Sequence, residues 1–409
     1  MPPLSIPVLG AMVPAESGWE PLGWDEVAQG PVPDRLLCKA SLIGISGLTP
    51  SRERASILAE RARIDYELPV IVGGPDIYGR FADEGPNLLL QEVDAICPSQ
   101  MSKRLMAEIL RDAGNERLEG IYSLQTGEPP DSVIPRRDLL PAKGYFAPNA
   151  IRSSSGCHLK CAWCTVGGRG FYPTPMDVLE ADLASLKGWF FLDTADSFGS
   201  HPALLDGVLP LYKKSGMKWG TEATVADLMK EHAGHQPLIA DMANAGCKII
   251  YVGIESISRQ LRLKKSSREQ AEELIKCAHS VGIIVIGSFI LDFNGDETAE
   301  EIAEMVDWAS YHVDFAQFSL TALLPGCDLR RQAIENGNTI PSDPKLFDGA
   351  HATAMHRNFT FSERNELLRQ AYVEFSRFKH IWRRTWQAPR SFAWLVFIAS
   401  LRYKKGIPS

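Results

Sequence analysis

The sequence lacks several features that would assign a protein class directly. The apolar run Phe392–Ile398 is far shorter than the roughly 20 residues that a membrane-spanning helix requires. The first residues show no basic stretch followed by a long apolar core, so we expect no secretory signal peptide. Basic residues are not in excess, because 43 Lys and Arg stand against 50 Asp and Glu, a formal net charge of −7. This charge argues against nucleic acid as the main partner, since phosphate binding requires a basic surface.

Paired cysteines and histidine-rich motifs are also missing. The eight cysteines show no regular paired spacing, which argues against a disulfide framework and favours a reducing cytoplasm. Histidine is absent from residues 1–156, and the later histidines form no metal-ligand spacing. With 409 residues, 45% hydrophobic and 23% charged, the chain is expected to be an ordinary soluble globular protein of two or three domains.

Three of the cysteines stand together in the stretch CHLKCAWC, residues 157–164, a C-x₃-C-x₂-C pattern. Three thiolates on one loop can bind three irons of a [4Fe–4S] cluster and leave the fourth iron open for another ligand. A zinc site with His158 or a remote residue as fourth ligand is the alternative. Zinc-binding cysteine pairs usually occur as two C-x₂-C units, and the sequence has no second pair. The pattern therefore predicts a cluster held by Cys157, Cys161 and Cys164.

This motif resembles that of the radical S-adenosylmethionine (SAM) enzymes. The family's aromatic residue before the third cysteine corresponds to Trp163, which is thereby a candidate SAM contact. The resemblance implies that the open iron chelates the amine and carboxylate of SAM, and that reduction yields a 5′-deoxyadenosyl radical. Gly167 and Gly168 would let the loop backbone approach the cofactor closely; a simple flexible loop is the alternative.

Residues 136–340 repeat a strand–helix alternation. The expected strands are residues 151–153, 189–193, 218–223, 249–256, 283–290 and 314–323, with helices at 176–186 and 268–281 among them. Six such units, with polar residues at the carboxyl ends of the strands, predict a partial (βα)₆ barrel with its site at that mouth. The radical SAM core is an open six-stranded barrel with the same spacing.

By the same resemblance, residues at the strand ends hold the aminocarboxylate and ribose of SAM. Glu222, Glu255 and Ser288 occupy such positions. Asp193 is the candidate beside the methionyl amine, and Asp196 competes with it for that role.

Residues 1–135 also alternate strand and helix signals, with expected strands at 41–46, 70–72 and 93–96 and helices at 50–64 and 102–113. Continuous apolar strands in such an alternation predict a parallel, doubly wound sheet. Ligands bind such sheets at the carboxyl ends of the strands. Ordinary turn chemistry would explain each glycine-rich strand end taken alone.

Taken together, these strand ends resemble the cobalamin-binding, Rossmann-like domain of one large radical SAM subgroup. That subgroup has a strand ending in G-x-S, then a helix, then a strand ending in a double glycine and a proline. The resemblance implies cobalamin contacts at the residues that match: Gly44, Ser46, Thr49, Gly73, Gly74 and Pro75. Because this part of the chain has no histidine, we expect the lower face of the cobalt to be water-bound or empty.

Residues 341–409 lose the alternation and are expected to form a small helical cap, with helices at 362–378 and 391–403. Basic residues flank the apolar run Phe392–Ile398 on both sides: Arg383, Arg384, Arg390, Arg402, Lys404 and Lys405. An aromatic-rich run with basic flanks suits either packing on the barrel or contact with a membrane surface.

The resemblance implies an enzyme with three parts: a cobalamin-type α/β domain (1–135), the radical SAM barrel with its cluster (136–340) and a helical C-terminal region (341–409). Its expected activity is methylation of an unactivated carbon of a small molecule or peptide, through a 5′-deoxyadenosyl radical and methylcobalamin. An electron donor such as flavodoxin or ferredoxin would reduce the cluster. Two alternatives stay open: a cyclase or rearrangement enzyme without methyl transfer, and a non-catalytic cobalamin- or cluster-binding protein.

Overall fold

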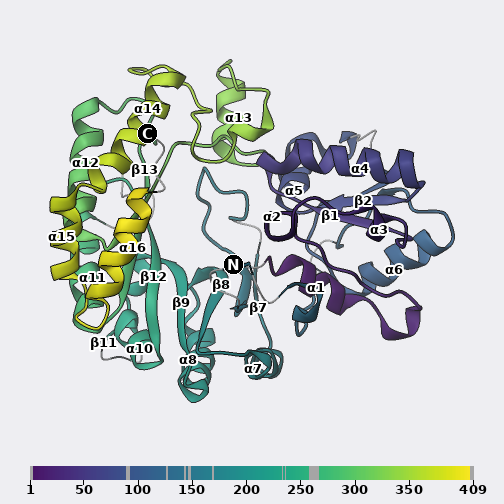
Figure 1. Cartoon of the computed structure of the whole chain (residues 1–409), viewed down its shortest axis with the longest axis horizontal. Helices are drawn as coiled ribbons and strands as arrows, with labels where there is room; N and C mark the ends of the chain where they lie inside the picture. The colour runs from purple at the N-terminus through teal and green to yellow at the C-terminus, as the bar shows by residue number, and fades with distance from the viewer. Residues whose placement is uncertain are drawn as a thin grey trace.

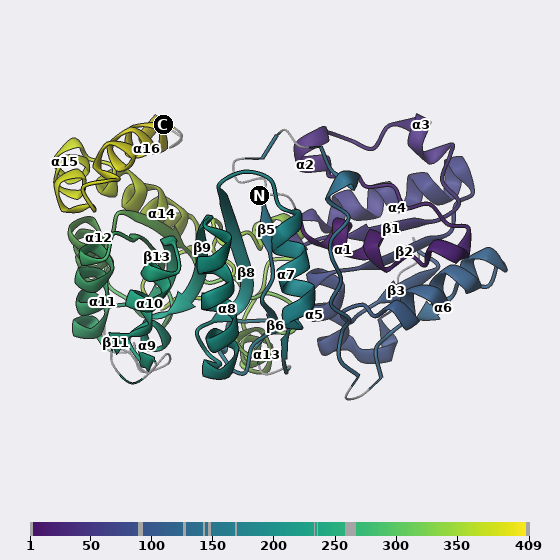
Figure 2. The same ribbon diagram turned by 90° about the horizontal axis from the view of Figure 1, so that it is seen from below.

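The computed structural model contains two parallel sheets followed by a helical C-terminal region (Figures 1 and 2). It describes residues 3–88, 93–125, 128–141, 144–145, 149–167, 170–232, 234, 236–257 and 267–405. In both views the N-terminal sheet lies at one end of the molecule and the larger sheet in the middle. Helices α15 (Phe378–Gln387) and α16 (Ala393–Lys405) lie at the opposite end. The predicted α/β fold with a helical C-terminal region is confirmed.

The N-terminal sheet has four parallel strands in the order β1-β2-β3-β4. Its strands are β1 (Ile43–Ser46), β2 (Val70–Gly73), β3 (Ala95–Cys97) and β4 (Gly120–Ile121), joined through helices α4 (Arg52–Tyr66), α5 (Pro75–Glu84) and α6 (Lys103–Gly114). Three short helices precede it: α1 (Ser5–Met12), α2 (Glu26–Gln29) and α3 (Asp34–Leu37). The sequence analysis did not predict α5, which starts with a proline in the position where proline is favourable.

The larger sheet has six parallel strands that neighbour one another in sequence order. They are β5 (Ala150–Ile151), β8 (Phe190–Phe198), β9 (Lys218–Thr224), β12 (Cys247–Glu255), β13 (Ile284–Ile290) and β14 (Phe315–Ser319). The main helices between them are α7 (Met176–Ser185), α8 (Pro202–Ser215), α10 (Leu238–Asn244), α11 (Arg268–Ser280) and α12 (Ala299–His312). Each of the six predicted strands is present, with shifted ends.

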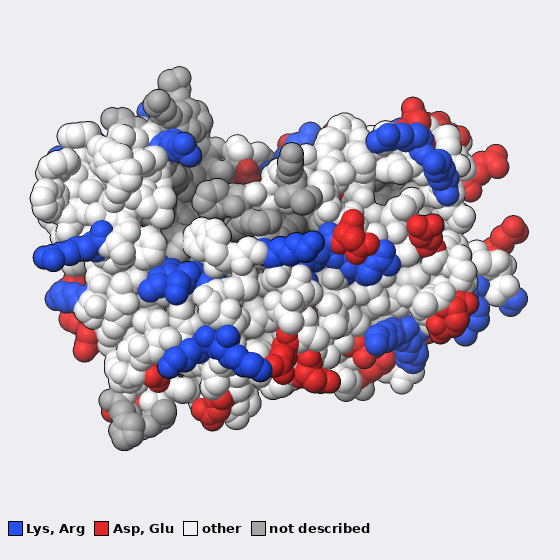
Figure 3. Space-filling view, turned by 60° about the horizontal axis from the view of Figure 1, so that its bottom comes forward, with Lys and Arg blue, Asp and Glu red and all other residues white. Residues whose placement is uncertain are grey.

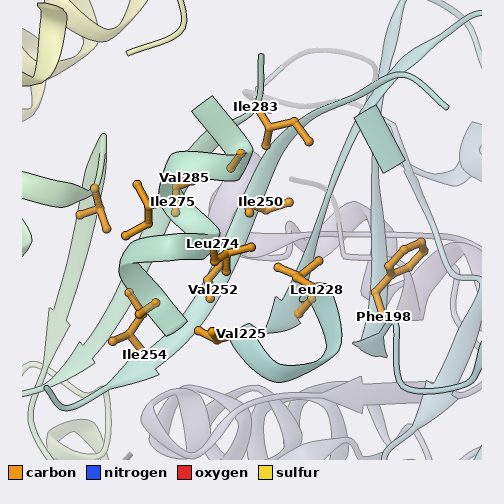
Figure 4. Close-up of a cluster of buried hydrophobic side chains, with 14 of the residues drawn as sticks. Phe198, Val225, Leu228, Ile250, Val252, Ile254, Leu274, Ile275, Ile283 and Val285 are labelled. Carbon is orange, nitrogen blue, oxygen red and sulfur yellow. The ribbon is translucent and has the colours of Figure 1, made fainter. Parts of the chain in front are cut away.

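The main core lies between this sheet and its outer helices. On β12, the buried side chains of Ile250, Val252 and Ile254 belong to the same cluster as Leu274 and Ile275 of α11 (Figure 4). Because strand side chains alternate between two faces, the residues in between point to the inner side of the sheet. This alternation decides which side chains can reach a ligand in the barrel.

Helix α5 of the N-terminal part packs against the loop that follows β14. A Cβ atom on Gly79 would lie 2.1 Å from the backbone oxygen of Pro325, so only glycine permits this contact. Beside it, the backbone N–H of Gly326 donates to Asp83 at 2.8 Å, and Arg331 pairs with the same carboxylate at 3.3 Å. These contacts hold the N-terminal sheet against the carboxyl-end face of the larger sheet.

The C-terminal region consists of α14 (Phe361–Phe375), α15 and α16, preceded by the short α13 (Asp328–Glu335). The structure divides the predicted helix 362–378 in two, with α14 ending before α15 begins. The hydroxyl of Tyr372 in α14 donates to the backbone oxygen of Phe318 at 2.6 Å, which ties α14 to β14. Val396 of α16 is buried against Ile284 of β13. Within the described ranges no helix is long and apolar enough to cross a membrane.

Candidate cofactor site

The cysteine motif occupies the loop of a short antiparallel hairpin, β6 (Ser154–Gly156) and β7 (Phe171–Pro173), directly after β5. Gly156 leads into the loop with a φ of 76°, and a Cβ atom there would lie 2.4 Å from the backbone oxygen of Gly170. Glycine satisfies both constraints at no steric cost. The hairpin therefore carries the motif at the carboxyl end of the first barrel strand, where the sequence analysis expected it.

None of the three motif cysteines forms a disulfide, and Cys157 is buried while the other two are partly exposed. The Sγ of Cys157 accepts the backbone N–H of Leu159, and the Sγ of Cys164 accepts that of Val166, each at 3.4 Å. Backbone N–H groups also donate to the sulfurs of protein-bound Fe–S clusters, where they help to set the reduction potential. Among the residues that the structure describes, no three His, Cys, Asp or Glu side chains form a ready-made metal site. The residue types and the donors fit a cluster, whose binding would draw the sulfurs together.

Contacts from the opposite side of the barrel position the loop. Trp163 packs edge-to-face against Phe293, with ring centroids 4.9 Å apart and planes at 87°. The backbone N–H of Leu329 in α13 donates to the backbone oxygen of Ala162 at 2.9 Å. The sequence analysis did not single out Phe293, since an aromatic residue after a strand is usually a core residue.

Gly167 closes the loop. It forms an isolated bridge with Cys157, and a Cβ atom on it would lie 2.4 Å from the backbone oxygen of Leu159. The conformation of the loop itself therefore requires glycine at position 167. The close approach of this backbone to a cofactor stays a prediction. Gly168 lies outside the described residues.

The structure places Asp193 away from the barrel interior. The residue is only 2% exposed, and its carboxylate accepts hydrogen bonds from the backbone of Ser153 at 3.0 Å, the backbone of Ala195 at 3.1 Å and the hydroxyl of Tyr212 at 2.8 Å. Burial raises the pKa of Asp193, and burial together with the Asp193 charge raises that of Tyr212 well above its usual value. Because strand side chains alternate, this residue faces helix α8, and its expected contact with SAM is not supported.

Asp196 takes the position that the sequence analysis had favoured for Asp193. Its side chain is exposed on β8, and its Oδ2 accepts the backbone N–H of Gly156 at 2.7 Å. The Asp196 carboxylate is thus bonded to the residue directly before Cys157, at the start of the cluster loop. Asp196 is the carboxylate of β8 that can reach a ligand beside the motif.

The predicted residues Glu222, Glu255 and Ser288 gather around Tyr251 on the inner face of the sheet. Tyr251 pairs in register with Glu222 of β9, and Ser288 of β13 lies opposite Gly253. Burial raises the pKa of Tyr251, and the charges of Glu255 and Glu222 add to this, whereas a hydrogen bond with Ser288 lowers it. The sequence analysis missed Tyr251, although its spacing of four residues from Glu255 puts both on one strand face.

Glu255 also has an unusual backbone. Its φ is 64°, and the two other non-glycine residues with positive φ in the described ranges, Glu67 and Glu116, lie just after helices. A long side chain in this conformation costs conformational energy, and such residues cluster at ligand sites. The strain at the end of β12 supports a binding role for Glu255.

The two strand ends of the N-terminal sheet approach each other closely. Gly74 has a φ of 88°, and a Cβ atom on it would lie 2.6 Å from the Oγ of Ser46. A Cβ atom on Gly73 would lie 3.0 Å from the backbone oxygen of Cys97. The edge is therefore formed by backbone atoms with few side chains, as close approach of a large ligand requires.

The remaining predicted cobalamin contacts divide into two kinds. Gly44 is exposed on β1, and a Cβ atom there would meet nothing within 4 Å. Thr49 is buried, and Pro75 begins α5, so both support the backbone of the strand ends.

A pocket of about 40 Å³ adjoins these strand ends. Arg52 and Asp76 line it and are joined by hydrogen bonds of 3.0 and 2.7 Å. It has room for only a few water molecules, so a cofactor would contact the exposed edge instead.

Residues 151–309 match the Radical SAM superfamily. This segment is a radical SAM domain. The sequence of the chain is 25% identical over 372 residues to an uncharacterized methyltransferase of Pyrococcus horikoshii, covering 82% of this chain and 78% of the relative. The segment that matches the superfamily, residues 151–309, contains the cysteine hairpin and strands β8 to β13. A radical SAM domain implies a [4Fe–4S] cluster and SAM as cofactors.

Two solved structures share the fold of this chain over nearly its whole length. The methyltransferase TsrM of Kitasatospora setae, with cobalamin and a [4Fe–4S] cluster bound, matches with a TM-score of 0.64 and 14% identity, covering 91% of this chain and 85% of that one. The cobalamin-dependent enzyme OxsB, with aqua-cobalamin and SAM bound, matches with a TM-score of 0.63 and 13% identity, covering 99% of this chain and 69% of that one. At this identity the likeness concerns the fold.

Proposed function

We propose that this protein is a cobalamin-dependent radical SAM methyltransferase that methylates an unactivated carbon of a small molecule. The observation that carries the proposal is the fold of the whole chain, in which a glycine-lined sheet edge and the cysteine hairpin are parts of one structure. The relative from Pyrococcus horikoshii is also called a methyltransferase. The corresponding parts are residues 1–135 for cobalamin, 136–340 for the radical chemistry and 341–409 for the helical cap.

In this proposal the barrel residues hold the cluster and SAM. Cys157, Cys161 and Cys164 bind three irons, and the bound cluster supplies the electron that cleaves SAM. Glu222, Glu255 and Ser288 bind polar groups of SAM from the inner face of the sheet, around the half-buried ring of Tyr251. Trp163 shields one side of the site, because Phe293 holds its ring in place. Asp196 fixes the start of the loop through Gly156.

The N-terminal sheet edge would hold cobalamin, which would carry the methyl group. Gly73 and Gly74 keep this edge free of side chains, while Gly44 and Ser46 face outward on β1. The contact between α5 and the loop after β14 keeps this edge beside the mouth of the barrel. That arrangement suits transfer of a group from one cofactor to a substrate activated by the other.

An electron donor such as flavodoxin or ferredoxin is part of the proposal, because the cluster must be reduced for each cleavage of SAM. We also propose a reducing compartment such as the cytoplasm. None of the eight cysteines forms a disulfide, as is usual for proteins of a reducing compartment.

The test is turnover by the anaerobically reconstituted protein with SAM, cobalamin and a strong reductant. We expect 5′-deoxyadenosine from radical cleavage and S-adenosylhomocysteine whose formation depends on added cobalamin, both measured by mass spectrometry. The Ser46→Leu variant, which places an apolar side chain on the exposed edge, should lose the cobalamin-dependent product and keep 5′-deoxyadenosine.

The outcomes separate the competing activities. Formation of 5′-deoxyadenosine without any S-adenosylhomocysteine would favour a cyclase or rearrangement enzyme and refute methyl transfer. Absence of both products with a fully loaded cluster would indicate a non-catalytic binding protein. The matched control is Cys38→Ser, which changes an exposed cysteine outside the motif and should leave both products unchanged.

A further inference from the structure

Helix α15 is partly reversed relative to an ordinary surface helix, because it buries two polar side chains and exposes aromatic ones. Its buried residues are His380, Ile381 and Arg384, whereas Phe378, Trp382 and Trp386 are 58%, 51% and 72% exposed. In a soluble protein the apolar stripe of a helix normally faces the core and the charged residues face water. The aromatic residues recur every four positions, so they form one stripe along the outside of the helix.

Hydrogen bonds fix this reversed orientation. The guanidinium of Arg384 donates to the backbone oxygen of Phe375 at 2.8 Å and lies 3.8 Å from the centre of that residue's ring. His380 faces Glu374 at 3.3 Å. Turning the helix to hide its aromatic residues would break these contacts of Arg384 and His380. The exposed stripe is therefore a stable feature of the fold.

Helix α16, which neighbours α15, also exposes apolar side chains. Trp394 and Leu395 are 71% and 52% exposed, and α16 packs against α15. Along α15 the rings follow one another, with centroids 6.5 Å apart for Phe378 and Trp382 and 5.8 Å apart for Trp382 and Trp386. We call these five residues the aromatic surface: Phe378, Trp382, Trp386, Trp394 and Leu395. Exposed apolar patches of this kind mark interaction sites.

The chain segment that carries the aromatic surface is basic. The last 35 residues of the chain contain eight Lys and Arg and no Asp or Glu, whereas the whole chain has a net charge of −7. Arg377 and Lys379 pair with Glu374, which lies just before this segment. Arg384 is buried. Arg390 lies between the two helices and Arg402 lies on α16, and both are exposed. In Figure 3 the end of the molecule that bears α15 and α16 is mostly uncharged, with Lys and Arg beside it. A partner for this surface must combine an apolar layer with negative charge.

We propose that the aromatic surface docks on an anionic lipid membrane, with α15 and α16 lying along the interface. Tryptophan is favoured at the boundary between headgroups and acyl chains, and nearby Lys and Arg are attracted to acidic headgroups. Neither helix can span a bilayer: α16 has 13 residues, and about 20 are needed. The attachment is therefore peripheral. It leaves the N-terminal sheet away from the lipid, since Figures 1 and 2 place α15 and α16 at the opposite end from that sheet.

The test is flotation of the full-length, reconstituted protein with vesicles of phosphatidylcholine alone or mixed with phosphatidylglycerol. We expect binding to the mixed vesicles that weakens as salt is raised, and little binding to phosphatidylcholine. Replacing Trp382, Trp386 and Trp394 together by alanine should reduce the bound fraction by about tenfold. Because these side chains are exposed, the variant should fold and should still form 5′-deoxyadenosine.

The matched control is Trp189→Ala, which removes a tryptophan that is 74% exposed outside the aromatic surface, next to β8. It should bind vesicles like the unmodified protein. The double variant Arg390→Glu, Arg402→Glu should lose binding to the anionic vesicles in particular. No binding of the unmodified protein, or equal binding by the triple tryptophan variant, would overturn the proposal. A dimer that the triple variant converts to a monomer, without vesicle binding, would instead assign the surface to a second copy of the chain.

Discussion

The contact between Gly79 and Pro325 offers a direct test of how the two sheets work together. In Gly79→Ala the new methyl group would lie 2.1 Å from the backbone oxygen and 2.8 Å from the backbone carbon of Pro325. Restoring an ordinary contact of 3.4 Å requires a retreat of about 1.3 Å between α5 and this loop. Both neighbours are backbone atoms, which cannot rotate away as a side chain can.

We expect this substitution to destabilise the contact by about 1–3 kcal/mol, the usual cost of overpacking. Alanine would otherwise stabilise a helix relative to glycine by up to about 1 kcal/mol, so destabilisation here must come from the clash. The separation would also lengthen the 2.8 Å bond from Gly326 to Asp83. Within the proposed function, the variant should keep 5′-deoxyadenosine formation, which needs only the barrel, and should lose most methyl transfer.

The assay combines thermal unfolding with product analysis. The matched control is Gly114→Ala, because that glycine ends α6 and a Cβ atom on it would meet only Trp19, at 3.8 Å. This control should be as stable as the unmodified protein or more so. If Gly79→Ala also melts at the unmodified temperature and yields the same ratio of the two products, the close contact does not couple the domains.

Three further predictions concern the barrel. Cys161→Ala, unlike Cys38→Ser, should lose the visible charge-transfer absorption of the reconstituted cluster, and full iron loading of the variant would contradict the assignment. Asp193→Asn should destabilise the protein by about 1–3 kcal/mol, seen as a lower melting temperature, without changing SAM affinity. Asp196→Asn should instead weaken SAM binding. The reverse result would restore Asp193 to the site. Since burial raises the pKa of Asp193, its contribution to stability falls as pH rises through that pKa, and Asp193→Asn should abolish this dependence. Glu255→Gly should relieve the φ of 64° and raise stability by up to about 1 kcal/mol while SAM binding is lost, and a variant that keeps its affinity would exclude the binding role.

The sequence alone determined the features that depend on neighbouring residues. The spacing of Cys157, Cys161 and Cys164 defines one loop, and the β-branched run at Val70 marks a buried strand. Strands β12 and β13 could be predicted because both are rich in apolar and β-branched residues, as strands of a parallel sheet are. The glycines at 73 and 74 could be assigned to a strand end for a similar reason, since they directly follow that strand.

Only the tertiary structure decided which face each side chain takes and which distant segments meet. Asp193 and Asp196 belong to one strand, and β8 has a register irregularity between Asp193 and Phe198, so no local pattern fixes which carboxylate faces the interior. Tyr251 appears as a core residue until the neighbouring strands place Glu222 and Ser288 beside it. The reversed α15 is a further case, because its aromatic stripe would suit burial equally well. Its exposure follows from contacts made by residues on the opposite side of the helix. These contacts cannot be read from the sequence of α15 alone.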